Sequence, residues 1–391
     1  MAHPLRVWIR GGFRQVLKIF YLFPVKSNRI FFANFCTSQY ACNPKYLTEY
    51  LCKKYPDRFD IIWTEGVPEE TCHTRGIRVA AKNSLRYYYY VLTSKVFVSN
   101  AGMPTYLPFR KKQITVATWH GGGLYKMAGV DTPAITGRDR QEFAQAAAAT
   151  RLYLSSSRLF TERVIRQAFL YSGEVLDSGL PRNDLFFEPK EKQAAIARRV
   201  KERYGIGRDT KVILFAPTFR GRFEHARGEN HEGLNVEACL QAAEERFGGK
   251  WAFFYRMHHA LAGNGEGIGI NVSDYPDMQE ILCAADILIT DYSSSMWDFA
   301  LTGKPGFLFA TDVESYESER DFYMPIEEWP YPVATSGEKL TEEIRRFDEQ
   351  RHLAKVTRHL ENLGSYEKGE ACQMAGERIA AECLGKREIA E

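Results

Sequence analysis

The sequence predicts an α/β protein with two domains, and three observations support this fold class. The chain has 391 residues, more than one ordinary hydrophobic core holds. Short apolar segments of strand type alternate with helical patterns, which is typical of parallel βαβ units. A charged helical segment without an internal strand, residues 191–204, interrupts this alternation and marks the domain boundary.

The elements of each half follow one another at the short intervals of βαβ units. In the first half, strands are predicted at residues 29–34, 59–63, 76–80, 95–99, 114–117 and 151–154, and helices at residues 44–54, 84–93 and 158–168. In the second half, strands are predicted near Val212, Trp251, Gly267, Ile287 and Gly306, with helices at residues 234–247, 278–285 and 295–302 and a polar helical tail at residues 338–391. The predicted architecture is two Rossmann-like domains, residues 28–190 and 191–391, that face each other across a cleft.

Residues 1–27 are predicted to contain an amphipathic helix. Its apolar arc comprises Leu5, Trp8, Ile9, Phe13, Val16, Ile19, Phe20 and Phe23, and its basic arc comprises Arg6, Arg10, Arg14 and Lys18. This pattern is typical of a membrane-surface helix, and no cleavage site of a signal peptide follows it. The expected membrane-binding residues are Arg6, Trp8, Arg10, Phe13, Arg14, Lys18 and Phe20. The alternative is that the helix packs on the protein itself or on a partner subunit of a homo-oligomer.

Composition excludes several classes of protein. A net charge of +3 is too small to indicate a nucleic-acid partner, and no nucleic-acid-binding motif is present. No stretch approaches about 20 continuous apolar residues, so a transmembrane helix is not expected. The eight cysteines show neither a C-x-x-C pair nor zinc-ligand spacing, which favours reduced thiols and a cytosolic location. No G-x-G-x-x-G motif with a following acidic residue is present, so a dinucleotide cofactor is not indicated.

One strand end carries three consecutive hydroxyls. The apolar segment 287–290 runs into a polar turn with Ser293, Ser294 and Ser295, where a helix is predicted to begin. Unpaired N–H groups, the helix dipole and serine hydroxyls all favour an anion there. The alternative is that one serine only caps the helix.

Other strand ends carry histidine, arginine, lysine or hydroxyl groups. They are His120, Gly121 and Lys126 after residues 114–117, Thr218 and Arg220 after the strand near Val212, and Arg256 and His258 after the strand near Trp251. Since ligands bind at the carboxyl ends of strands in parallel α/β sheets, we expect these groups to share one site.

Five groups of residues form recognisable motifs. They are Trp119-His120-Gly121 with Lys126; Gly179-x-Pro181-Arg182-Asn183-Asp184; Ala216-Pro217-Thr218-x-Arg220; Arg256-x-His258; and Ile289-Thr290-Asp291-Tyr292-Ser293-Ser294 with Asp298-Phe299 and Lys304-Pro305. In order and spacing they resemble the CDP-glycerol glycerophosphotransferase family, the teichoic-acid primases and polymerases. The resemblance covers roughly residues 29–384.

The resemblance implies a metal-independent GT-B enzyme without a cofactor, peripheral on the cytoplasmic face of the cell membrane. The enzyme would transfer glycerol phosphate from CDP-glycerol to a hydroxyl of a polyprenyl-diphosphate-linked saccharide, release CMP and lie on an anionic membrane surface. The residue types agree, because phosphoryl transfer to an alcohol needs a proton acceptor and positive or hydrogen-bonding groups around the phosphates. Imidazole titrates near neutrality and suits the proton acceptor.

The resemblance also assigns roles to residues. It places the general base at His120 and puts His258 at the donor diphosphate, with the reverse as the alternative. The expected substrate-binding residues are Gly121, Gly122, Lys126, Thr218, Arg220, Arg256, Asp291, Ser293 and Ser294. For Arg220 the alternative is a surface or interdomain ion pair. Asp291 and Asp298 are candidates for ribose binding or helix capping, and no metal is predicted.

Two positions depart from the family pattern. Gly122-Gly123-Leu124-Tyr125 replaces a common Thr-Pro-Leu sequence, and because glycine lets a backbone approach a ligand closely, contact with the acceptor or its diphosphate is expected here. His259 stands where the family usually has proline and is expected to be a loop residue.

Other functions stay open at this point. A nucleotide-sugar glycosyltransferase of the GT-B type would release UDP or GDP, and a related enzyme would use CDP-ribitol. An inactive scaffold is disfavoured, because both histidines stand at the expected strand ends. The residues do not decide between single addition and polymerisation, although the lack of an additional N-terminal domain favours a short product.

Overall fold

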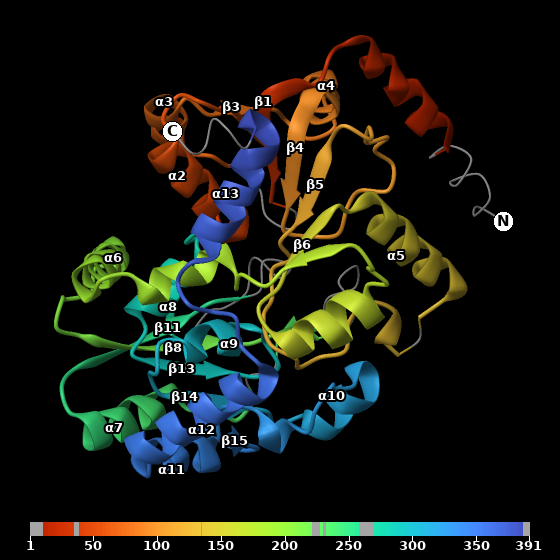
Figure 1. Cartoon of the computed structure of the whole chain (residues 1–391). Helices are drawn as coiled ribbons and strands as arrows, with labels where there is room; N and C mark the ends of the chain where they lie inside the picture. Colours follow the sequence, from red (N-terminus) through yellow and green to blue (C-terminus); the bar gives the residue numbers. More distant parts are fainter. Residues whose placement is uncertain are drawn as a thin grey trace.

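The computed structural model describes residues 11–34, 39–133, 135–220, 227–229, 232–257 and 269–385. These residues form two α/β units, each built around one parallel sheet with helices packed against it (Figure 1). The predicted fold class is therefore confirmed.

The first sheet has seven described strands in the order β3-β2-β1-β4-β5-β6-β7, all parallel. The strands are β1 (Lys26–Ala33), β2 (Asp60–Trp63), β3 (Arg78–Val79), β4 (Ser94–Ser99), β5 (Ile114–Ala117), β6 (Leu152–Leu154) and β7 (Glu174–Leu176). The strand order reverses direction between β1 and β4. Ligands of open parallel sheets bind beside such a point, at the carboxyl ends of the strands.

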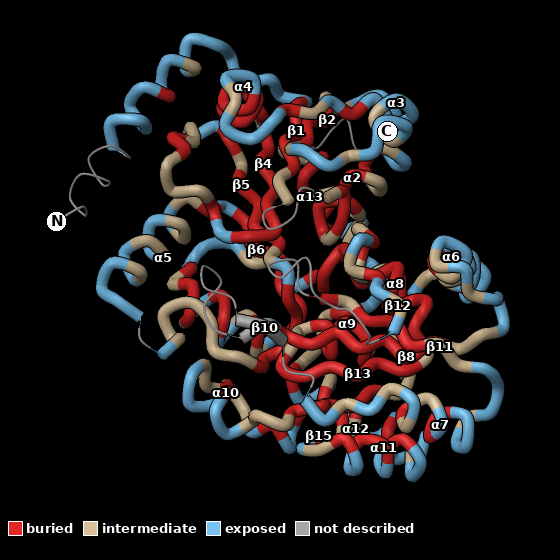
Figure 2. Tube along the Cα trace, turned by 180° about the vertical axis from the view of Figure 1, so that it is seen from behind, coloured by how far each residue is buried: buried red, intermediate tan, exposed pale blue. Residues whose placement is uncertain are grey.

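Alternating side chains of β1 build two layers of core. Ile30 and Phe32 face α2 (Cys42–Lys54) and share one cluster with its Leu47. Phe31 points to the other face, where its ring meets Tyr87 of α4 (Leu85–Thr93) edge-on at 5.4 Å. This two-residue period explains why the second half of the strand, residues 30–33, is apolar, since both faces are covered there. Figure 2 shows the central strands of both sheets as the buried centre of each unit.

The second sheet has six described strands in the order β12-β11-β8-β13-β14-β15, again parallel. They are β8 (Lys211–Ala216), β11 (Trp251–Tyr255), β12 (Ile270–Asn271), β13 (Ile287–Thr290), β14 (Gly306–Phe309) and β15 (Val333–Ala334). The helices of this unit include α6 (Lys190–Arg203), α7 (Val236–Phe247), α8 (Met278–Ala284), α9 (Ser295–Ala300) and α11 (Gly337–Arg345). A short antiparallel pair, β9 (Phe219–Arg220) and β10 (Arg227–Glu229), lies apart from the sheet.

The carboxyl-terminal tail returns to the first sheet. After α12 (Glu349–Leu363), helix α13 (Ala371–Leu384) packs on α2, β1 and β4, as Figure 1 shows. Its Ala375 and Ile379 are buried in the same cluster as Ile30. The sequence assigned residues 191–391 to one domain, whereas this helix packs on elements of the first sheet. The polar pattern of the tail predicted a helix but carried no information about which sheet it covers.

Several elements were not predicted individually. They are α3 (Glu69–Arg75), η2 (Gly129–Asp131), α5 (Gly137–Ala149), η4 (Pro181–Phe187), α10 (Val313–Arg320) and η7 (Ile326–Glu328), together with β7 and β15. The helix predicted at residues 158–168 is a π-helix, η3 (Phe160–Ala168). Helix α5 does carry a sequence signal, because Thr136 and Asp139 form a capping box at its start.

The amino-terminal segment is helical over residues 11–16 and in η1 (Leu17–Leu22), and β1 begins at Lys26, inside the predicted segment 1–27. One side of this helix packs on α4. Leu17 is buried, and the ring of Phe13 meets Tyr88 edge-on at 5.5 Å. The alternative of packing on the protein's own body therefore holds for this side of the helix.

The opposite side of the same helix is exposed. Val16, Ile19 and Leu22 are 67%, 61% and 82% exposed, so an apolar stripe faces away from the body. Arg6, Trp8 and Arg10, three of the predicted membrane-binding residues, lie outside the described residues. In the described part of the chain, no helix is long and apolar enough to cross a membrane.

Candidate active site

His120 stands in the loop after β5, at the carboxyl edge of the first sheet. Its Nδ1 lies 2.7 Å from the carbonyl oxygen of Asn100, which follows β4. A carbonyl only accepts hydrogen bonds, so Nδ1 carries the proton and Nε2 keeps the lone pair of the neutral ring. The indole of Trp119 stacks on the imidazole with 4.4 Å between the ring centres. The hydrogen bond and the stacked indole thus fix the orientation of the imidazole ring.

The glycines that follow bring this loop against the second unit. A Cβ on Gly121 would lie 3.1 Å from Oγ of Ser294, and a Cβ on Gly122 would overlap the indole of Trp297. Both contacts are to the loop and helix after β13. The structure therefore joins the histidine loop of one sheet to the serine loop of the other, and the indole covers that face of Gly122.

The three serines lie at the start of α9. Oγ of Ser293 accepts hydrogen bonds from the backbone N–H of Ser295, at 3.2 Å, and from its hydroxyl, at 3.0 Å. Ser294 makes no capping hydrogen bond with its side chain, and α9 ends at Ala300, two residues before the predicted end. Because the helix has only six residues, its dipole is weak, and an anion at its start would be bound mainly by the hydroxyls and loop N–H groups.

Asp291 connects two neighbouring strand ends. Its Oδ1 accepts hydrogen bonds from the backbone N–H and the hydroxyl of Thr218, at 2.8 and 2.6 Å, and from the N–H of Tyr292 at 2.6 Å. Asp291 and Thr218 are 1% and 6% exposed. Both were predicted to bind substrate, and in this structure Asp291 fixes the loops after β8 and β13 to each other.

Arg256 follows β11 in the same sheet. Its Nη1 donates to the carbonyl oxygens of Val272, at 3.2 Å, and Tyr275, at 2.7 Å. Burial lowers the pKa of the guanidinium, because burial penalises the charged form. The carboxylates of Asp277 and Asp274 act in the opposite direction and favour the charged form.

A buried ion pair stands behind the histidine loop. Nη2 of Arg182 lies 2.7 Å from Oδ2 of Asp298 on α9, and Nη1 donates to the carbonyl oxygen of His120 at 2.7 Å. Asn43 of α2 accepts from the N–H of Arg182 at 3.1 Å and donates to the carbonyl oxygen of Trp119 at 2.8 Å. Arg182 belongs to one of the sequence motifs, but the motif suggests no role for it, and no signal in the sequence pairs it with Asp298.

Glu367, in the segment before α13, was also missed. Its carboxylate accepts hydrogen bonds from the backbone N–H of Leu180 at 3.0 Å, from Nδ2 of Asn183 at 2.9 Å and from Nε1 of Trp297 at 3.0 Å. Burial raises the pKa of Glu367 to about 7. This one carboxyl group joins the returning tail, the motif that contains Asn183, and α9.

Three further predicted residues are His258, Arg220 and Lys126. His258 lies outside the described residues, and of Arg220 only the backbone in β9 is described. Lys126 forms a β-bridge with Phe322, so its backbone links the first unit to the segment after α10. Among the residues that the structure describes, no group of three or more His, Cys, Asp or Glu side chains could hold a metal ion.

Nearly the whole chain is similar to known proteins. The profile of the family described as CDP-Glycerol:Poly(glycerophosphate) glycerophosphotransferase matches residues 15–381. The chain belongs to this family. It is a glycerophosphotransferase, as the sequence motifs predicted.

Individual proteins similar to this glycerophosphotransferase carry names that agree with the family. The teichoic acid poly(glycerol phosphate) polymerase of Bacillus spizizenii is 28% identical over 384 residues, 95% of this chain and 95% of the relative. The teichoic acid glycerol-phosphate transferase of Staphylococcus aureus is 28% identical over 361 residues, 88% of this chain and 91% of the relative. A histidine-to-asparagine variant of the wall teichoic acid polymerase TagF, soaked with CDPG, has a TM-score of 0.81 at 28% identity and covers 97% of this chain and 95% of its own. The fold is thus TagF-like, of the GT-B type.

Proposed function

We propose that this glycerophosphotransferase transfers glycerol phosphate from CDP-glycerol to a hydroxyl of a lipid-linked saccharide and releases CMP, with His120 as the general base. The observation that supports this most directly is the 2.7 Å contact between Nδ1 of His120 and the carbonyl oxygen of Asn100. This contact leaves Nε2 as the proton acceptor of the neutral ring.

In the proposed reaction, Nε2 of His120 takes the proton of the acceptor hydroxyl while its oxygen attacks the phosphorus that carries glycerol. The bond between this phosphorus and the bridging oxygen breaks, and CMP leaves with that oxygen. One phosphodiester forms, one diphosphate bond breaks, and the proton ends on the imidazolium.

The donor phosphates belong in this proposal to the second sheet. Arg256 supplies positive charge, and the hydroxyls and N–H groups of the loop Ser293–Ser295 supply hydrogen bonds to the leaving group. Thr218 and Gly121 both contact the loop after β13, Thr218 at Asp291 and Gly121 at Ser294. We assign His258 to the diphosphate on the family motif alone. Fixed donors of this kind stabilise developing charge without reorganising during the reaction.

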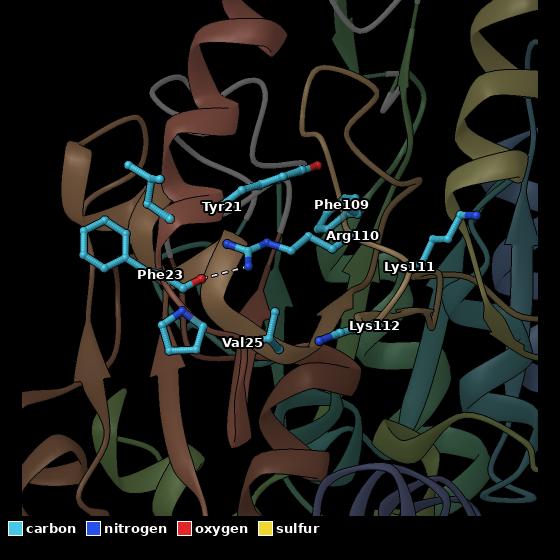
Figure 3. Close-up of a pocket in the computed structure, with 9 residues that line it drawn as sticks. Tyr21, Phe23, Val25, Phe109, Arg110, Lys111 and Lys112 are labelled. Carbon is cyan, nitrogen blue, oxygen red and sulfur yellow. Dashed lines mark hydrogen bonds between the residues drawn. The ribbon is translucent and has the colours of Figure 1, made fainter.

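The acceptor requires a membrane location in this proposal, because a polyprenyl chain stays in the bilayer. The exposed stripe of Val16, Ile19 and Leu22 offers apolar area. Next to it, a pocket of about 720 Å³ is lined by Leu22, Phe23 and the cations Arg110, Lys111 and Lys112, together with Tyr21, Pro24, Val25 and Phe109. Figure 3 shows Arg110 in this pocket, hydrogen-bonded to the carbonyl oxygen of Phe23 at 2.8 Å. Each cation adds about 1 kcal/mol of attraction to anionic lipid, which suits a peripheral protein on the cytoplasmic leaflet.

A comparison of donors tests the proposed function. The enzyme and a lipid-linked saccharide are incubated in separate reactions with radiolabelled CDP-glycerol, CDP-ribitol or UDP-sugars. We expect CMP and a labelled lipid product from CDP-glycerol. Release of UDP would establish a glycosyltransferase instead, and faster turnover of CDP-ribitol would change the assigned donor.

A further inference from the structure

A second cavity, of about 930 Å³, lies at the carboxyl ends of the strands of the first sheet. Asn34 after β1, Thr64 after β2 and Ser99 at the end of β4 line it, and His120 stands in its wall. Since the general base borders the cavity, a molecule bound inside it can present a hydroxyl to Nε2. The cavity therefore suits the acceptor rather than the donor, whose proposed ligands are on the other sheet.

The walls of the cavity combine aromatic faces with hydroxyl and amide groups. Tyr106, Trp119, Phe143 and Phe169 contribute rings, while Asn34, Thr64 and Thr132 contribute polar atoms. Rings that present apolar faces beside polar groups match a sugar, whose C–H faces are apolar and whose edges carry hydroxyls. The volume exceeds what a single glycerol needs and admits one or two sugar rings.

The charges that line the cavity are unfavourable for a polyanion. Among the described residues that line it are four carboxylates, Glu65, Asp139, Glu142 and Glu319, and two cations, Lys82 and Arg320. Adding Arg138, which pairs with Glu142 at 3.3 Å, still leaves more acids than bases. A poly(glycerol phosphate) chain carries one negative charge per unit, and the excess of carboxylates in the described lining repels it.

The loop that forms one wall also contacts the amino-terminal helix. Nη1 of Arg14 donates to the carbonyl oxygen of Thr105, at 2.8 Å, and Thr105 lines the cavity. The hydroxyl of Tyr21 donates to the carbonyl oxygen of Pro108 at 2.5 Å. The helix proposed to lie on the membrane is thus attached to the wall of the cavity, and the first sugars of a lipid-linked molecule would reach it from the bilayer.

From this composition we infer that the cavity binds the uncharged saccharide of the acceptor and discriminates against an acceptor that already carries several glycerol phosphates. The enzyme then adds its first unit or units to a saccharide primer and does not elongate a long chain. This inference rests on the proposed function for its reaction, but the binding preference of the cavity can be measured without it.

The kinetic test compares two acceptors with CDP-glycerol as donor: a lipid-linked disaccharide, and the same molecule extended by about six glycerol phosphates. We expect kcat/KM to be at least about tenfold higher for the unextended disaccharide. An equal or higher value for the extended acceptor would overturn the inference while leaving the proposed function intact.

A matched pair of substitutions tests the charge argument. Glu142 and Glu162 each pair with an arginine four residues earlier on a helix, but only Glu142 lines the cavity. Glu142→Gln is expected to raise kcat/KM for the extended acceptor about twofold to fivefold at low salt, and Glu162→Gln to leave it unchanged. Equal behaviour of the two variants would overturn the assignment of the charges.

Binding is measured separately by saturation-transfer NMR with the free disaccharide and with a glycerol phosphate oligomer of about six units. We expect transfer to the disaccharide, its loss in Phe143→Ala, and none to the oligomer. Binding of the oligomer in preference to the disaccharide would contradict the inference. If CDP-glycerol released no CMP with any acceptor, the proposed function would fail while this measurement still tested the cavity.

Discussion

Arg182 and Asp298 form an ion pair, with 2.7 Å between Nη2 and Oδ2, that connects the two units directly behind His120. Their side chains are 7% and 3% exposed. Because the same guanidinium donates to the carbonyl oxygen of His120, the pair fixes the loop of the proposed base relative to α9. The same ion pair therefore positions the loop of His120 and stabilises the contact between the two units.

Removing one partner of this pair is expected to be costly. Asp298→Asn leaves the Arg182 charge buried without a carboxylate, which typically lowers the free energy of unfolding by about 3–5 kcal/mol. Urea unfolding measures this. Glu342→Gln is the control, because Glu342 forms an exposed ion pair with Arg346 whose loss costs at most about 1 kcal/mol. Equal effects of the two substitutions would show that the buried pair contributes no more than a surface pair.

Glu367 predicts a specific dependence of stability on pH. Its pKa is raised from 4.5 to about 7 by burial, so between these values the folded state binds more protons than the unfolded state. The free energy of unfolding that Glu367 contributes is therefore fully present below pH 4.5 and is lost as pH rises through about 7. The maximum slope for one group is about 1.4 kcal/mol per pH unit.

This dependence is best measured as a difference between proteins. Burial lowers the pKa of His359 to about 4, which gives an opposite slope below pH 6.5 in the same protein. Subtracting the urea unfolding energies of Glu367→Gln from those of the unsubstituted protein at pH 5, 6 and 7 cancels the histidine contribution. We expect the difference to decrease with pH, and a constant difference would contradict the raised pKa.

The exposed stripe of the amino-terminal helix predicts membrane binding that can be removed without unfolding. Replacing Val16, Ile19 and Leu22 together by glutamate is expected to abolish sedimentation with anionic vesicles, because apolar area is lost and like charge is added. Leu353→Glu on α12, 41% exposed, is the control and should still sediment. Sedimentation of the triple variant at moderate salt would refute membrane attachment through this stripe.

The sequence predicted most of the fold because its strands are buried on both faces. A segment such as residues 287–290 is continuously apolar and ends in hydroxyls, which defines both a strand and a strand end. The place of α13 was not predictable in this way, because Ala375 and Ile379 meet Ile30 only after the tail has crossed between units.

The sequence pointed to the polar residues at the strand ends, but not to the buried residues that hold their loops in place. His120, Thr218 and Arg256 stand at strand ends, where local pattern suffices. The partners of Arg182 and Glu367 described above lie between 62 and 187 residues away along the chain, a separation at which one sequence gives no pairing information. Asp291 shows the converse, since its position suggested a ligand while its hydrogen bonds fix two loops.

The proposed function depends most on His120, which we propose removes the proton of the acceptor hydroxyl. The most direct measurement is the turnover of His120→Ala with CDP-glycerol and a lipid-linked disaccharide. Calorimetry measures whether this variant still binds CDP-glycerol, and the surface variant His73→Ala is the control. We predict that turnover of His120→Ala falls by about 100-fold or more while it still binds CDP-glycerol and His73→Ala keeps full activity. Turnover of His120→Ala close to that of the unsubstituted enzyme would contradict the account.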